Sequence, residues 1–174
     1  MLPLVQAACL FALLIASAVT DFRERRVSNG AVAGAIVGGL LLQALRGSWQ
    51  GFQAGLGGLL VGFGIFYPLY YLGGLGAGDA KLMAAVGALT SWRFVLWATV
   101  YTSFAGALLA VGTLFFRGGW REALHRAATL KRRERKAEVA QGDRRRTIPY
   151  AAAICAGSAF AFWWITRRTG AWPW

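Results

Sequence analysis

The feature that most constrains the fold of this chain is its succession of long apolar runs. Hydrophobic residues make up 57% of the 174 residues, and the mean hydropathy is +0.48. Such runs are too long for the core of a soluble domain of this size, whereas a membrane-spanning helix needs about 20 mostly apolar residues. We therefore predict an all-α fold, a polytopic membrane helix bundle.

Polar or basic breaks divide the apolar sequence into about six segments. The predicted transmembrane helices are 2–20, 30–45, 52–72, 80–92, 94–116 and 148–166. The first segment resembles a secretory signal, but its cations follow it instead of preceding it, so we expect a retained first span. Residues 1–174 are predicted to form a single membrane-embedded domain with a basic loop at about 117–147.

The cations predict the orientation. The chain has 19 Lys and Arg against 7 Asp and Glu. Most of the cations flank apolar segments, which is typical of membrane proteins, so we expect no nucleic-acid partner. Six spans would place 15 of the cations on one side and 4 on the other. The basic side is predicted to be cytoplasmic, with both termini outside a bacterial inner membrane, and the loop 117–147 is expected to lie on anionic lipid.

Two aspartates lie at boundaries of the apolar segments. Asp21 follows the first segment, and Asp79 follows the glycine-rich run GGLGAG, on the same predicted side. A carboxylate beside hydrocarbon needs a partner, a proton or water, and acids in such places usually have a function. The helix after Asp79 is short, since residues 81–92 would span about 18 Å of a core of roughly 30 Å. We therefore expect Asp79 to be recessed beside a water-accessible pocket.

These residues also have ordinary structural explanations. Asp79 could be the N-cap of the short helix, and Asp21 could be a boundary residue beside a basic cluster. Glycines at four-residue spacing within spans are expected to permit close helix packing; they are Gly30, Gly34, Gly38, Gly58 and Gly62. The glycines before Asp79 are expected to supply positive φ angles in a tight turn; they are Gly73, Gly74, Gly76 and Gly78.

Three segments resemble a known family, the type IV prepilin peptidases, which are membrane aspartic proteases with a GxGD signature. DFRERRVSN, residues 21–29, resembles the first motif of the family, and GAGDAK, residues 76–81, resembles the second. IPYAAAICAG, residues 148–157, resembles a Pro-Tyr segment that opens a late family helix. The chain looks like the short form that lacks a methyltransferase region and serves tight-adherence pili.

The resemblance implies that Asp21 and Asp79 are the catalytic pair. It also implies site-shaping roles for the remaining motif residues, which are Gly76, Gly78, Lys81 and Asn29. We expect Lys81 to reach for lipid headgroups and Asn29 to support the turn. Ser28 stands where the family commonly has proline, and this difference is expected to loosen the turn.

The implied activity is endopeptidase cleavage of the basic leader of a prepilin or pseudopilin at the cytoplasmic membrane edge. Two carboxylates that share a site hold one proton near neutrality, so the ionised one can activate water while its partner polarises the scissile carbonyl. We expect no cofactor and no metal, because both cysteines lie in apolar segments without CxxC spacing and the chain has one histidine.

Two alternatives use the same aspartates. A small proton- or cation-coupled transporter or channel component could use them as ion sites. A presenilin-like intramembrane protease also has a GxGD motif, but that pattern has no counterpart of DFRERRVSN.

Overall fold

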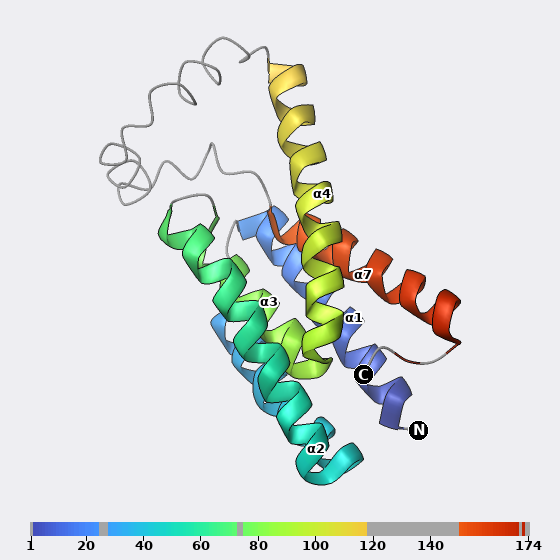
Figure 1. Cartoon of the computed structure of the whole chain (residues 1–174). Coiled ribbons are helices and arrows are strands. Elements are labelled where there is room, and N and C mark those ends of the chain that lie inside the picture. Colours follow the sequence, from blue (N-terminus) through green and yellow to red (C-terminus); the bar gives the residue numbers. More distant parts are fainter. Residues whose placement is uncertain (1, 25–27, 73–74, 118–149, 171, 173–174) are drawn as a thin grey trace.

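A computed structural model describes residues 2–24, 28–72, 75–117, 150–170 and 172. All the regular structure in these ranges is helical, which confirms the predicted all-α fold (Figure 1). The helices are α1 (Leu2–Glu24), α2 (Asn29–Tyr71), α3 (Ala77–Leu89), α4 (Trp92–Arg117) and α7 (Tyr150–Thr169).

Three of the described helices are long and apolar enough to cross a membrane. The candidate spans are Leu2–Arg23, Asn29–Tyr71 and Trp92–Gly112. The chain is therefore an integral membrane protein, and the count of six spans stays a prediction. The predicted basic loop at 117–147 lies almost entirely outside the described residues.

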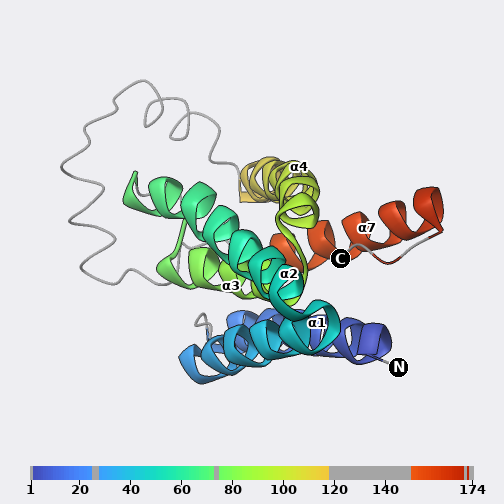
Figure 2. The same ribbon diagram turned by 60° about the horizontal axis from the view of Figure 1, so that its bottom comes forward.

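Helix α2 folds back on itself at Ser48, which has φ 51° and ψ −128° inside the helix. Gly39 and Gly55 both approach the backbone of Ala88 in α3. A straight helix would separate these two glycines by about 24 Å, so the two arms of α2 must run in opposite directions. Figure 2 shows this reversal at the cyan end of α2. The two arms correspond to the predicted segments 30–45 and 52–72.

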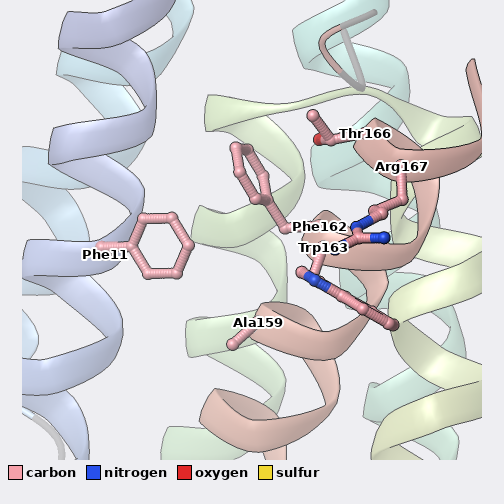
Figure 3. A pocket seen from close by; sticks show the side chains of 6 residues that line it. All are labelled: Phe11, Ala159, Phe162, Trp163, Thr166 and Arg167. Atoms are coloured by element: carbon pink, nitrogen blue, oxygen red, sulfur yellow. The ribbon is translucent and has the colours of Figure 1, made fainter. Parts of the chain in front are cut away.

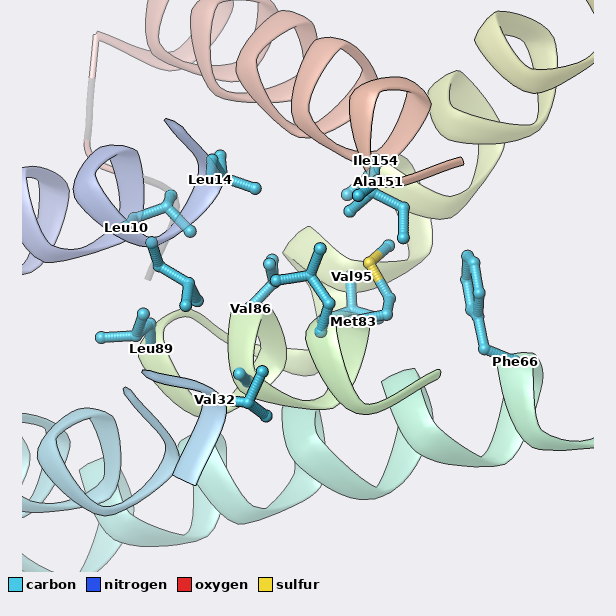
Figure 4. Close-up of a cluster of buried hydrophobic side chains, with 14 of the residues drawn as sticks. Leu10, Leu14, Val32, Phe66, Met83, Val86, Leu89, Val95, Ala151 and Ile154 are labelled. Carbon is cyan, nitrogen blue, oxygen red and sulfur yellow. The ribbon is translucent and has the colours of Figure 1, made fainter. Parts of the chain in front are cut away.

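Helix α3 is the centre of the bundle, and its residues from 82 to 89 are all buried. A helix that is apolar on every side is expected to be surrounded by other elements. Its side chains contact those of α1, both arms of α2, α4 and α7 in one apolar cluster (Figure 4). With 13 residues, α3 is about 20 Å long and too short to cross a hydrocarbon core of roughly 30 Å.

Close contacts between backbones hold α3 against α2. A Cβ atom on Gly58 would lie 2.3 Å from the carbonyl oxygen of Gly87, and one on Gly62 would lie 2.5 Å from that of Met83. The predicted packing role of these two glycines is confirmed. The same prediction for Gly30, Gly34 and Gly38 is wrong within the described ranges, where no other helix lies within 4 Å of their Cβ positions. Gly39, on the adjacent face, makes the contact instead.

Helix α7 runs antiparallel to α4 and also packs on α1. Gly157 of α7 lies against the backbone and hydroxyl of Thr102 in α4. The rings of Phe11 in α1 and Phe162 in α7 meet edge to face, with centroids 5.1 Å apart. This packing brings the first residues of α7 to the end of α1 that carries Asp21 (Figure 1).

Candidate active site

Asp21 lies in the last turn of α1 and is half-buried. The helix continues to Glu24, so the predicted end at residue 20 is four residues too early. The Oδ2 atom of Asp21 accepts a hydrogen bond from the backbone N–H of Ala151, at 3.3 Å. The first N–H groups of a helix have no partner within the helix, so this carboxylate satisfies a donor of α7. The contact joins residues 130 positions apart.

Asp79 lies in the first turn of α3, where it is 8% exposed. The N-cap is Gly76, so the expectation that Asp79 itself is the N-cap is wrong. The backbone N–H of Gly76 donates to Oδ2 of Asp79 at 3.0 Å, and the N–H of Asp79 donates to the carbonyl of Gly76 at 3.1 Å. This reciprocal pair fixes the carboxyl at the start of the helix.

Gly76 is needed for space and not for a positive φ angle. Its φ is −78°, and Gly78 is an ordinary residue of α3, so the expectation of positive φ is wrong for both. Gly73 and Gly74 lie outside the described residues. A Cβ on Gly76 would lie 3.2 Å from Oδ2 of Asp79. A side chain at this position would therefore crowd the carboxyl group.

The two carboxyl groups interact electrostatically. Burial raises the pKa of Asp79 from 3.8 to about 6, the N–H of Gly76 lowers it, and the negative charge of Asp21 raises it. Asp79 lies outside the three candidate membrane spans. A carboxyl group with this pKa keeps its proton in mildly acidic conditions and is close to titration at neutral pH. The structure thus brings together the two aspartates that the sequence singled out.

Tyr150 completes this end of the bundle, although no role was predicted for it. It is the first residue of α7, and it lies near enough to Asp79 for the charged forms of the two groups to repel each other. Its ring packs on Gly106 of α4, where a Cβ atom would lie 2.6 Å from the ring. The dipeptide Pro149-Tyr150 is a sequence signal for the start of a helix. That signal locates α7 but does not reveal that its first residue lies near Asp79.

The remaining motif residues connect α2 to α3. The ammonium group of Lys81 donates to Oδ1 of Asn29 at 3.2 Å, and both side chains are exposed. This contact gives Lys81 a protein partner in place of the expected headgroup, and Asn29 is the first residue of α2. Ser28 is the N-cap of α2 and accepts from the N–H of Ala31 at 3.5 Å. Ser28 therefore stabilises the start of α2 as its N-cap. The prediction of a looser turn did not include this role.

A hollow between α1 and α7 lies away from the two aspartates. It has a volume of about 510 Å³ and is lined mainly by apolar groups (Figure 3). Phe11, on its α1 side, precedes Asp21 by ten residues, or about 15 Å of helix. None of the described residues that line it has a carboxyl group, and hydrolysis by an acid pair requires two. Within the described ranges, no three His, Cys, Asp or Glu side chains cluster as metal ligands.

Comparison with known proteins identifies the family. Residues 8–111 match the Type IV leader peptidase family, and this match covers more than half of the chain. The chain belongs to this family. The matched range contains both aspartates and the two motif segments that carry them, DFRERRVSN and GAGDAK, so the family resemblance predicted from these motifs is confirmed.

One relative within the leader peptidases is a protein of Myxococcus xanthus (strain DK1622) named prepilin leader peptidase/N-methyltransferase. It is 30% identical over 122 residues, which cover 66% of this chain and 36% of the relative. The chain therefore matches about a third of the length of that protein. No solved structure matches the chain.

Proposed function

We propose that this leader peptidase family member is a membrane aspartic endopeptidase that removes the basic leader from prepilin-like substrates. The observation that carries the proposal is the electrostatic pairing of Asp21 and Asp79, which come from different helices. A pair of acids is the group that an aspartic protease needs, and family membership favours this reading of the pair over an ion site of a transporter.

The chemistry follows from one proton shared by two carboxyl groups. The ionised aspartate takes a proton from water as the water oxygen attacks the carbonyl carbon of the scissile bond. The protonated aspartate donates to the carbonyl oxygen, which gives a neutral tetrahedral intermediate. When the C–N bond breaks, the newly protonated aspartate donates its proton to the nitrogen, which leaves as an amine, and a hydroxyl of the intermediate returns a proton to the other aspartate as the new carboxyl group forms. The pair ends with one proton, as it began.

We place the reaction at the cytoplasmic edge of the membrane. The distribution of 15 cations against 4 supports a cytoplasmic position for both aspartates. Helix α3 is short, and Asp79 lies at its start, so the scissile bond would be recessed from the surface. The proposed substrate is a single apolar helix preceded by a basic leader and glycine, with cleavage just before the helix. Anionic lipid would hold both the basic leader and the basic loop near the membrane.

The test is to co-express the chain with short proteins of this description from the genome that encodes it. Mass spectrometry of the recovered substrate should show a new N-terminus just before the apolar helix. The variant with both Asp21→Asn and Asp79→Asn should leave the leader in place. Asp143→Asn, which changes the third aspartate of the chain outside both motifs, is the matched control and should cleave normally. Intact substrates at normal accumulation of the wild-type chain would contradict the proposal.

A further inference from the structure

The first turn of α7 interacts with both aspartates. The N–H of Ala151 donates to Asp21 at 3.3 Å, and the preceding residue, Tyr150, interacts electrostatically with Asp79. The Tyr150 ring has a fixed support, because Gly106 of α4 leaves room for the ring and for no side chain of its own. One helix start therefore carries a hydrogen-bond donor to Asp21 and a residue near Asp79.

The two carboxyl groups differ in burial. Asp21 accepts a backbone N–H bond from Ala151, and Asp79 accepts one from Gly76. Such bonds favour the ionised form of both groups. Asp79, however, is 8% exposed, whereas Asp21 is only half-buried, so water stabilises a charge less on Asp79.

Few titratable groups act on Asp79. Asp21 from α1 and Tyr150 from α7 interact with it among the described residues. Lys81 on its own helix directs its ammonium group to Asn29. The phenol of Tyr150 is neutral at physiological pH, so Tyr150 places no charge beside Asp79.

We propose that Tyr150 is a positioning residue: its ring, packed on Gly106, holds the first turn of α7 so that Ala151 keeps Asp21 as the anion while Asp79 bears the proton. The proposal rests on the proposed peptidase function and adds an assignment to it. Asp21 would accept the proton of the attacking water, and Asp79 would donate to the scissile carbonyl. Substrate need not touch Tyr150.

The test uses the full-length chain in detergent with a purified substrate that has a basic leader, a glycine and one apolar helix. Tyr150→Ala and Gly106→Ala should each lower kcat by about 10- to 100-fold with little change in KM, because a small misplacement of catalytic groups has effects of this size. Both should also move the alkaline limb of the pH profile to lower pH, since water reaches Asp79. Tyr150→Phe keeps the ring and should restore the wild-type profile.

Two controls match these variants. Gly112→Ala adds a methyl group to the same helix as Gly106, at a position with no described residue within 4 Å, and should be neutral. Tyr101→Phe removes a phenol hydroxyl from α4, where Tyr101 packs on Phe160 of α7, and should also be neutral. Variants that accumulate and melt like the wild type remove misfolding as the cause of a lower kcat.

Two results would overturn the positioning role. The first is a wild-type kcat and pH profile in Tyr150→Ala or Gly106→Ala. The second is a Tyr150→Phe variant as slow as Tyr150→Ala, which would make the hydroxyl the active group. If the variant with both Asp21→Asn and Asp79→Asn still cleaved, the proposed function itself would fail, so the two failures are distinguishable.

Discussion

The two ends of α3 are both polar, yet they differ in charge and in burial. At its start, Asp79 interacts with a second carboxylate, and Lys81 is exposed. At its other end, the carbonyl of Thr90 accepts from the side-chain amide of Gln43, and the hydroxyl of Thr90 donates to the carbonyl of Val86 at 2.7 Å. Gln43 and Thr90 are fully buried and carry no charge.

The two ends of this short helix therefore differ in role: one end fixes the packing, and the other carries the acid used in the proposed chemistry. Neutral buried groups that satisfy each other fix the packing and have no dependence on protonation in the physiological range. A buried carboxyl group next to another carboxylate has an unfavourable charged form, which is the condition for proton transfer. We therefore expect substitutions at the Gln43 end to change stability alone, and those at the Asp79 end to change activity.

The largest effect on stability should come from Asp79→Asn, and it should be a gain. The pKa of Asp79 is about 6 in the folded chain, above the ordinary 3.8, so ionisation of this carboxyl group destabilises the fold. The penalty is absent at low pH and grows as the pH rises from about 4 to about 6. Asparagine has no charge to desolvate and can still accept from Gly76. The gain should reach up to about 3 kcal/mol above pH 6 and vanish near pH 4. Thermal melting in detergent from about pH 4 to 8 measures it, and a pH-independent difference would contradict it.

Gln43→Ala should lower the stability of the folded chain, whereas Asp79→Asn should raise it. It leaves the buried carbonyl of Thr90 without this donor, so the free energy of unfolding should fall by about 1–3 kcal/mol. Gln53→Ala, an exposed glutamine in the same helix, is the control and should change it by less than about 0.5 kcal/mol. Cleavage per folded molecule should stay at the wild-type rate. A slower cleavage rate without loss of stability would show that the Gln43 end of α3 also affects activity.

Lys81→Met and Asn29→Ala should each lower kcat/KM by up to about tenfold, because they remove one exposed hydrogen bond that joins the two motif segments. The double variant should be no slower than either single variant, since both remove the same contact. Lys131→Met makes the same change away from the motifs and serves as the control. Additive losses would show that Lys81 and Asn29 act independently.

The smallest effect is expected from replacing Arg144, Arg145 and Arg146 with glutamine. These residues lie outside the described ranges, and no motif residue is near them in sequence. If the segment rests on anionic lipid, cleavage should stay within about twofold of the wild type. Loss of cleavage at normal accumulation would assign the segment to substrate handling or to assembly of the site.

The sequence predicted the features that depend on composition and on rare residues. Helical membrane segments follow from apolar run length, and Asp21 and Asp79 are conspicuous because few acids lie beside apolar runs. It predicted the packing of Gly58 and Gly62 but missed that of Gly39, because Gly38 and Gly39 differ only in the face that a partner selects. It also missed the bond from Ala151 to Asp21, because every helix start offers backbone N–H groups and only tertiary packing decides which acid reaches them.

The most direct test of the catalytic pair compares Asp21→Asn, Asp79→Asn and the double variant in the cleavage assay. Asparagine keeps the shape and the capping ability of aspartate but supplies no carboxylate, so it separates catalysis from the structural role at Gly76. Each single variant should lose cleavage while the protein still inserts and accumulates, and the double variant should be scarcely slower, because the two groups act as one unit. Near-normal cleavage by Asp79→Asn would reduce Asp79 to a structural residue of α3 and contradict the aspartic protease assignment.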